Sequence, residues 1–281
     1  MAGMACRPSR GPAAYAGSLA GNLPLTRPMP LLASKPEFND YSTLLPRYRA
    51  ALARLASWGV TVPDTSRLKR YERDLASLNS QLPQPVPFPL ALRLAHVLRE
   101  LDEIVEIAES FSRHPNATEL SLLKRLDAGT DIPEVEGGDT AREAQYELYL
   151  RAVFVGSGLQ VEVGDPDLSL LLGTNPYSVE AKRPGSPPRF DERLREGRSQ
   201  IEAKGSPGLV AISLDRLVAV PDGLLRVQSL ASLGSAVSNL VADYLEPRAA
   251  AIRKMLDCLG LPFRPTLIGH RIPFVIGLSS G

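Results

Sequence analysis

Residues 146–184 combine short apolar runs with turn-forming residues, a pattern that predicts one helix followed by three short strands. The turn at 173–176, Gly-Thr-Asn-Pro, would fold the second and third strands into a hairpin. Further along, residues 209–214 (LVAISL) are almost continuously apolar, as expected of a buried central strand. A helix is expected over 190–203, although Gly197 would weaken it by about 1 kcal/mol relative to alanine. The chain is therefore predicted to be an α/β protein.

Four ionisable residues of this stretch are expected to converge. They are Glu147 on the helix, Asp167 at the start of the second strand, and Glu180 and Lys182 on the third. Side chains alternate between the two faces of a strand, so Glu180 and Lys182 share a face, and the hairpin would bring Asp167 close to Glu180. Buried carboxylates repel one another, and a divalent cation between them would remove the repulsion. Mg²⁺ suits such a site, because it is usually held by one or two carboxylates together with waters and phosphate oxygens.

The same residues form a motif. Pro166-Asp167, followed on the next predicted strand by Glu180-Ala181-Lys182, resembles the PD-(D/E)xK motif of the restriction-endonuclease-like nuclease superfamily. The resemblance covers residues 139–217. It implies the αβββαβ core of that superfamily, in which helices flank a mixed central sheet, here preceded by an N-terminal all-α region.

The resemblance also implies an activity, namely metal-dependent hydrolysis of phosphodiester bonds. Asp167, Glu180 and the backbone carbonyl of Ala181 would hold Mg²⁺, for which Mn²⁺ can substitute, and Lys182 would position the attacking water. The expected substrate is nucleic acid, above all double-stranded DNA, cut to leave a 5′-phosphate and a 3′-hydroxyl. Cutting both strands takes two active sites, so a homodimer is expected. Asp165 is the rival of Asp167, but it precedes a proline, where turns favour aspartate.

Two helices are expected to contribute further residues. An acidic residue on the first helix is common in this superfamily, and Glu147 and Glu143 compete for this role. Thr140 and Glu143 have the spacing of a capping box, which gives Glu143 a structural task and favours Glu147 at the site. A glutamine or basic residue on the later helix often contributes to such sites, and the resemblance assigns this position to Gln200.

Three regions are expected along the chain. Residues 1–36 contain no acid and show no clear period, which predicts a disordered tail. Residues 37–130 are predicted to form a helical region, and residues 131–281 the nuclease-like domain. The most regular helix, over 90–113, has an apolar stripe on one face and acids on the other, and we expect the acidic face to be solvated. These acids are Glu100, Glu103, Glu106 and Glu109.

Composition narrows the other possibilities. Cys6 and Cys258 lie far apart, which argues against a disulfide framework and a zinc site and fits a reducing, cytoplasmic compartment. The formal net charge is only +1, but basic residues exceed acids over 47–73 and 182–204. These segments either bind phosphate or are solvated helix faces. No apolar run approaches the length of a membrane span. Arginine greatly outnumbers lysine, which suggests a bacterial source.

Two other functions stay open. The chain could be a non-catalytic module in which a nuclease fold binds nucleic acid or protein. It could also be a structural or regulatory protein whose helical region makes the contacts. Other enzyme classes find no support, because the chain has no GxxxxGK[ST] phosphate loop, GxSxG elbow or HExxH helix.

Overall fold

The computed structural model describes residues 41–81, 88–129, 140–205, 207–215, 217–218, 225–227, 230–250, 266–269 and 274–276. From Tyr41 onward the chain forms one compact unit. The predicted tail, residues 1–36, lies outside the described residues, and the division at residue 130 stays a prediction.

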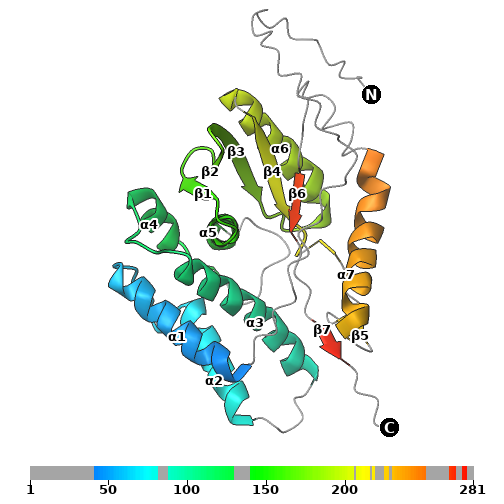
Figure 1. Cartoon of the computed structure of the whole chain (residues 1–281). Helices are drawn as coiled ribbons and strands as arrows, with labels where there is room; N and C mark the ends of the chain where they lie inside the picture. Colours follow the sequence, from blue (N-terminus) through cyan, green and yellow to red (C-terminus); the bar gives the residue numbers. More distant parts are fainter. Residues whose placement is uncertain are drawn as a thin grey trace, which may run out of the picture. The chain divides into compact units, whose positions relative to one another are not determined.

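A five-stranded mixed sheet is the scaffold of this unit (Figure 1). Its spatial order is β1 (Gln160–Val163), β2 (Leu168–Leu172), β3 (Asn175–Lys182), β4 (Gly208–Ser213) and β6 (Thr266–Gly269). The first three strands pair antiparallel, whereas β4 and β6 join in parallel. A second, two-stranded parallel sheet pairs β5 (Leu225–Val227) with β7 (Phe274–Ile276). The predicted α/β class with a mixed sheet is confirmed.

The predicted hairpin joins β2 to β3. Leu172 pairs with Asn175, which leaves Gly173 and Thr174 as the turn between the two strands. Gly173 has φ 65°, a left-handed conformation that glycine adopts without steric cost. The hairpin register sets Leu168 opposite Val179, and so places the residue before β2, Asp167, beside the end of β3.

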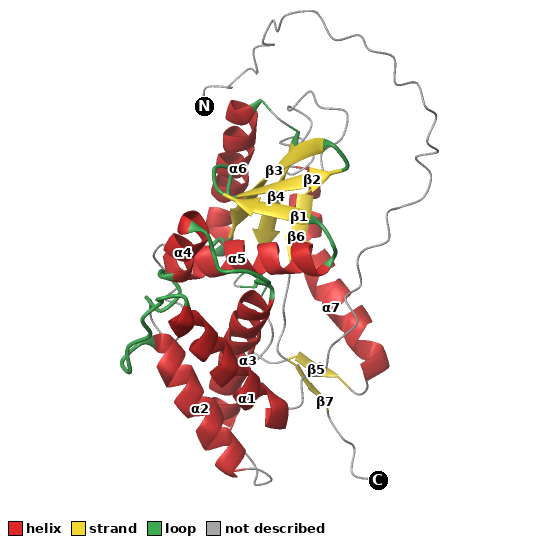
Figure 2. Ribbon diagram, turned by 60° about the vertical axis from the view of Figure 1, so that its left-hand side comes forward, coloured by secondary structure: helices red, strands yellow, loops and turns green. Residues whose placement is uncertain are grey.

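Helices cover both faces of the sheet (Figure 2). On one face, α5 (Thr140–Gly156) packs against β3, and Val179 and Ala211 point into its hydrophobic core. On the other face, α6 (Phe190–Lys204) covers β3 and β4, and Val210 and Ile212 enter a second core. This division follows from the alternation of side chains along a strand. The site residues that lie at even positions of β3 therefore face α6.

Further helices complete the unit. α1 (Tyr41–Ser57), α2 (Arg67–Gln81), α3 (Phe88–Glu109) and α4 (Ala117–Leu123) share the hydrophobic core of α5, and α7 (Leu230–Leu245) packs on the core of α6. α3 is the helix predicted over 90–113, and the described part of its predicted apolar stripe, from Val97 onward, is buried except for the half-buried Leu98. Among the helices that the structure describes, none is long and apolar enough to cross a membrane.

The prediction that the acidic face of α3 is solvated is wrong for Glu100 and Glu103. Glu100 and Glu103 are only 2% and 1% exposed, whereas Glu109 is exposed and pairs with Arg47 on the surface. The reason is that this face lies against four buried arginines from other parts of the chain and from α3 itself. We call the assembly the Glu100 cluster, and its members are Arg67, Arg99, Glu100, Glu103, Arg142, Gln145, Arg183 and Asp215.

Glu100 is the hub of the cluster. Arg67 Nη1 lies 3.0 Å from Glu100 Oε2, and Arg142 Nε lies 3.4 Å from Glu100 Oε1. Gln145 donates to both Glu100 and Glu103, at 3.0 and 2.5 Å. Arg183, which follows β3 directly, pairs with Glu103 at 3.3 Å. The cluster therefore fastens α2, α3 and α5 to the end of the strand that carries Lys182.

Removing the hub should destabilise the fold strongly. In Glu100→Gln, four buried arginines share one carboxylate fewer, and we expect the free energy of unfolding to fall by about 3–5 kcal/mol. The matched control, Glu109→Gln, breaks an exposed pair and should cost less than about 1 kcal/mol. Urea denaturation at pH 7 measures both values, and similar losses in the two variants would contradict the central place of Glu100.

The dependence of stability on pH gives a second test of the role of Glu100. Burial opposes the ionisation of Glu100, but the surrounding arginines, Arg183 foremost, outweigh it and hold the pKa well below its ordinary value of 4.5. The stabilisation is therefore fully present above about pH 4.5 and is lost as the pH falls toward the folded-state pKa. The difference in free energy of unfolding between wild type and Glu100→Gln should shrink below pH 4.5, and a constant difference would count against this account.

Candidate metal-dependent site

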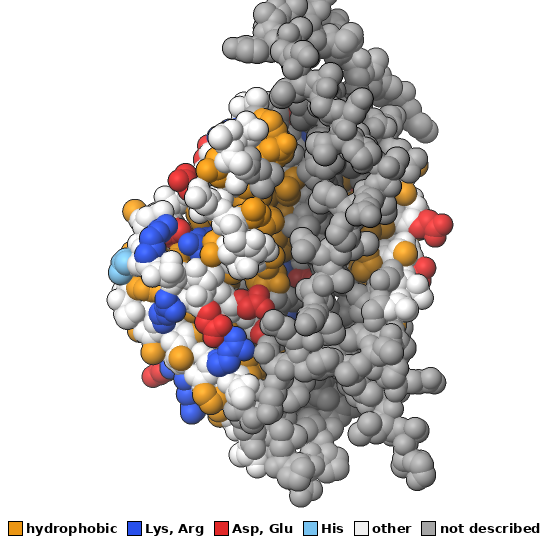
Figure 3. Space-filling view, viewed as in Figure 1, with side chains coloured by type: hydrophobic (Ala, Val, Ile, Leu, Met, Phe, Trp, Pro, Cys, Tyr) orange, Lys and Arg blue, Asp and Glu red, His pale blue; other side chains and the backbone are white. Residues whose placement is uncertain are grey.

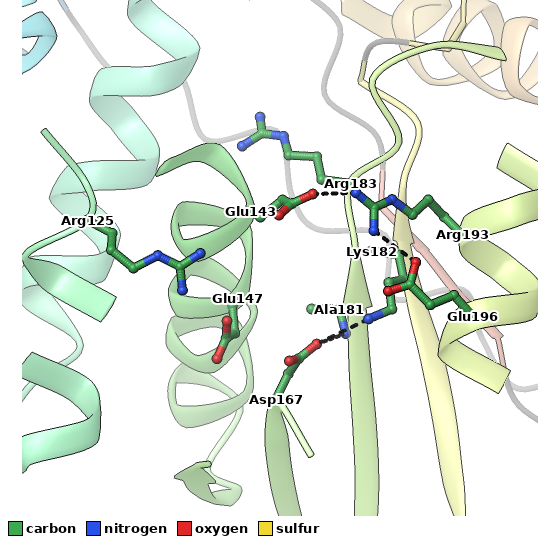
Figure 4. Close-up of a pocket in the computed structure, with 9 residues that line it drawn as sticks. All are labelled: Arg125, Glu143, Glu147, Asp167, Ala181, Lys182, Arg183, Arg193 and Glu196. Carbon is green, nitrogen blue, oxygen red and sulfur yellow. Dashed lines mark hydrogen bonds and ion pairs between the residues drawn. The ribbon is translucent and has the colours of Figure 1, made fainter. Parts of the chain in front are cut away.

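The candidate site lies at the end of β3, beside the point where β2 begins. Asp167 precedes β2, and its Oδ2 accepts a hydrogen bond of 2.8 Å from the backbone N–H of Ala181 (Figure 4). This bond replaces a rung of the β2–β3 ladder with a side-chain contact. It fixes the carboxylate of Asp167 against β3.

The carbonyl of Ala181 faces the same side. In a strand, the N–H and C=O of one residue point toward the same neighbouring strand, so the Ala181 carbonyl is directed toward the Asp167 side as well. β2 begins only at Leu168, which pairs with Val179, and residues 164–167 form the turn from β1, in which the Gly164 N–H donates to the Asp167 carbonyl at 3.2 Å. No residue of β2 therefore lies opposite Ala181. Its carbonyl lies outside the ladder, next to the carboxylate of Asp167, as expected if both served as metal ligands.

Glu180 and Lys182 lie on one face of β3, as the alternation predicted. Lys182 Nζ is 3.0 Å from Glu180 Oε2 and 3.9 Å from Asp167 Oδ2. Both side chains are largely buried, with Lys182 at 8% and Glu180 at 2% exposure. The three charged residues of the motif thus meet at one point, although they come from two strands.

A pocket of about 160 Å³ opens beside this point (Figure 4). Four predicted site residues line it, namely Asp167, Ala181 and Lys182 together with Glu147 from α5. Glu180 is not among the lining residues, but its carboxylate pairs with Lys182, which is. The full lining is Arg125, Glu143, Glu147, Asp167, Ala181, Lys182, Arg183, Arg193 and Glu196.

Both candidate carboxylates of α5 reach the pocket. Glu143 Oε1 accepts from Arg193 Nη2 at 2.8 Å, so Glu143 already holds a cation. The helix begins at Thr140 itself, and the Glu143 carboxylate pairs with Arg193. Glu147 lies next to Asp167 and Lys182, whose charges affect its pKa. The arrangement favours Glu147 as the carboxylate that is available to the site.

Two other predictions can be compared with the geometry. Gln200 is exposed and does not line the pocket, and α6 contributes Arg193 and Glu196 instead. The role assigned to Gln200 stays a prediction. Asp165, the rival of Asp167, is largely exposed and pairs with Lys204 away from the pocket. Its predicted structural role fits this position.

The carboxylates of the site are held in surroundings that disfavour negative charge. Burial, and secondly the nearby charge of Asp167, raise the pKa of Glu147 to about 8. Burial and Asp167 likewise raise the pKa of Glu180 to about 7. A divalent cation in the pocket would reverse both effects, because it would attract the ionised forms.

The residues present fit a Mg²⁺ ion. Among the residues that the structure describes, no group of three or more His, Cys, Asp or Glu side chains could by itself hold a metal. Mg²⁺ does not require such a cage, because it keeps several waters and takes one or two carboxylates. Asp167, Glu180 and the carbonyl of Ala181 would supply that smaller set of hard oxygen ligands.

Some pocket residues were not predicted. Arg125 lies after α4 and donates to the carbonyl of Thr140 at 3.0 Å, while Glu196 pairs with Arg193 at 2.8 Å. Nothing in the local sequence of Arg125 signals a site, because the fold alone brings the end of α4 to the start of α5. Glu196 has a weak signal, namely its position three residues after a basic residue on a helix.

The raised pKa of Glu147 predicts a specific dependence of stability on pH. The folded-state pKa lies above the unfolded value, so the folded protein binds this proton more tightly and loses stability as the pH rises from about 4.5 to 8. Without divalent cations, Glu147→Gln should therefore be more stable than wild type at pH 8.5, by about 1 kcal/mol or 2–4 °C in Tm. At pH 5 the two proteins should melt within about 1 °C of each other. Thermal melts in EDTA test this, with the exposed Glu162→Gln as control; a gain equal at both pH values would contradict the buried, ionisable Glu147.

Compared with known proteins, the chain matches no family model, no curated protein and no solved structure. Its function must therefore be inferred from the site itself.

Proposed function

We propose that this protein is a Mg²⁺-dependent nuclease, able to use Mn²⁺, that hydrolyses phosphodiester bonds of nucleic acid, above all of double-stranded DNA. The observation that carries the proposal is the meeting of Asp167, Glu180 and Lys182 beside a pocket, with the carbonyl of Ala181 turned to the same side. A structural ion pair would need only one carboxylate for the one lysine. The surplus acid has a use if a cation binds there.

The arrangement of elements supports a restriction-endonuclease-like core. The chain runs α5, β1, β2, β3, α6, β4, the order that the motif resemblance implied. Asp167 opens the second strand of this series, and Glu180 and Lys182 end the third. Motif and element order agree, and together they support the proposal more than the short motif could alone.

In the proposed reaction each residue has a defined task. Asp167, Glu180 and the Ala181 carbonyl would hold Mg²⁺, which when bound would lower the pKa of water and neutralise charge on the scissile phosphate. Lys182, kept near both carboxylates, orients the attacking water and stabilises the developing negative charge. Glu147 would support the metal or accept the proton released by water, because a bound cation would favour its ionised form.

Charge balance explains how a phosphate would be attracted. The pocket lining includes four basic and four acidic side chains, and the carboxylate of Glu180 pairs with one of the basic ones, Lys182. Bound Mg²⁺ would therefore shift the pocket from nearly neutral to positive. Figure 3 shows charges of both signs interspersed on the visible face, without a continuous basic patch there.

The predicted basic segments support this view. In the first segment, Arg47, Arg49 and Lys69 all pair with acids, which favours the solvated-face interpretation for these three cations. In the second, Arg198 pairs with Glu202 on the same helix. The strongest attraction for phosphate is thus expected at the pocket rather than along either segment.

Activity should depend on Asp167 and Lys182 and not on similar residues nearby. Supercoiled plasmid incubated with the protein and MgCl₂ should be nicked, and EDTA should stop the reaction. Lys182→Ala and Asp167→Asn should each lower the rate by about 10²- to 10⁴-fold. The matched controls Lys204→Ala and Asp165→Asn remove one lysine and one aspartate from an exposed pair, and should leave the rate within about twofold.

The other outcomes separate the competing functions. Cleavage that survives Asp167→Asn unchanged would show that the assigned site is wrong. DNA binding without cleavage in Mg²⁺ or Mn²⁺ would favour the non-catalytic binding module. Absence of both binding and cleavage would favour a structural or regulatory interaction protein. Gel filtration and the ratio of nicked to linear plasmid would test the expected homodimer.

A further inference from the structure

Gly197 lies in the middle of α6, where glycine is a poor choice. A glycine in the interior of a helix gives more freedom to the unfolded chain than alanine does, so the helix is weakened. Gly197 has no positive φ that would call for glycine. The reason for it must therefore be the space around its Cα atom.

The space is occupied by the lysine of the candidate site. A Cβ atom built on Gly197 would lie 3.2 Å from Cε and 3.4 Å from Cγ of Lys182, and 3.0 Å from Cγ1 of Val210. These separations are tighter than ordinary van der Waals contact. The aliphatic stem of Lys182 thus lies directly against the backbone of α6, and the missing side chain of Gly197 gives it room.

The two neighbours would respond differently to an added methyl group. Val210 is 5% exposed and enclosed in the core formed with Phe190, Leu194 and Ile201. Lys182 lines the open pocket, so its stem can move away from α6. A displacement of a few tenths of an ångström at Cε would be passed on to Nζ, which lies 3.0 Å from Glu180 and 3.9 Å from Asp167.

We propose that Gly197 is a positioning residue for Lys182: by lacking a side chain, it lets the lysine stem lie along α6 and sets the amine between Glu180 and Asp167. The catalytic consequence rests on the proposed nuclease function. The effect of Gly197 on the position of the Lys182 amine does not rest on that function, because this position can be measured without any reaction.

The kinetic test compares two glycines on helices. Gly197→Ala should lower kcat for plasmid nicking about 10- to 100-fold, as expected for a small misplacement of a catalytic group, with KM and Tm close to wild type. The control Gly156→Ala, whose added Cβ would meet nothing within 4 Å, should leave kcat unchanged. In a Lys182→Ala background, Gly197→Ala should have no further effect on the residual rate. An equal loss in both backgrounds would overturn the proposal.

The second test needs no activity. Lysines labelled by reductive ¹³C-methylation give separate NMR signals, and the signal of Lys182 is identified by its absence in Lys182→Arg. Gly197→Ala should shift this signal and leave that of Lys204 in place, whereas Gly156→Ala should shift neither. An unmoved Lys182 signal would overturn the proposal even if the nuclease assignment holds. Absence of cleavage in wild type, with a shifted signal, would refute only the function.

A folding defect would also be informative. If Gly197→Ala does not fold, the double variant Gly197→Ala/Lys182→Ala should fold again, because it removes the stem that the new methyl group meets. Circular dichroism and thermal melts measure this recovery. If the double variant remains unfolded, the added methyl group conflicts with Val210 rather than with Lys182, and Gly197 does not position the lysine.

Discussion

Two consecutive buried cations at the end of β3, Lys182 and Arg183, set the main constraint on this structure. A cation that is buried without acidic partners destabilises the folded protein by several kcal/mol. Lys182 finds Glu180 and Asp167 at the pocket, and Arg183 finds Glu103 and its neighbours in the Glu100 cluster. The end of one strand is thereby tied at once to the site and to the helices, so that the helical region contributes to holding the lysine in place.

The two cations differ in how their charge is balanced. Around Arg183, the Glu100 cluster contains four arginines and three carboxylates, and the ionised form of Glu100 is favoured so strongly that its pKa is lowered. Around Lys182 the balance is reversed, because one amine meets several carboxylates and the pKa values of Glu147 and Glu180 are raised. The cluster has one more cation than carboxylates and so offers no place for a further cation. The carboxylates around Lys182 outnumber its one amine, which is the physical argument for a cation at the pocket and not at the cluster.

The local sequence pattern was enough to predict the parts of the site whose positions are set by one strand or one hairpin. Alternation placed Glu180 and Lys182 on one face, and the turn after β2 brought Asp167 beside them. The burial of Glu100 could not be predicted in this way. Its arginine partners stand at positions 67, 142 and 183, far apart in the sequence, and without them an acidic helix face reads as solvated. The same limit applies to Arg125, which only the packing of α4 on α5 brings to the pocket.

The turn between β1 and β2 shows how residues that make no contact in the proposed chemistry can still shape the site. Residues 164–167 form this turn, in which the Gly164 N–H donates to the Asp167 carbonyl, so the β2–β3 ladder ends at the Leu168–Val179 pair. The side chain of Asp167 takes up the N–H of Ala181, whose carbonyl has no residue of β2 opposite it. The turn thus provides a carboxylate held in place and an oxygen outside the ladder, next to each other. Gly197 acts by the same logic on the other side of β3, where the absence of a group, rather than its presence, makes room for Lys182.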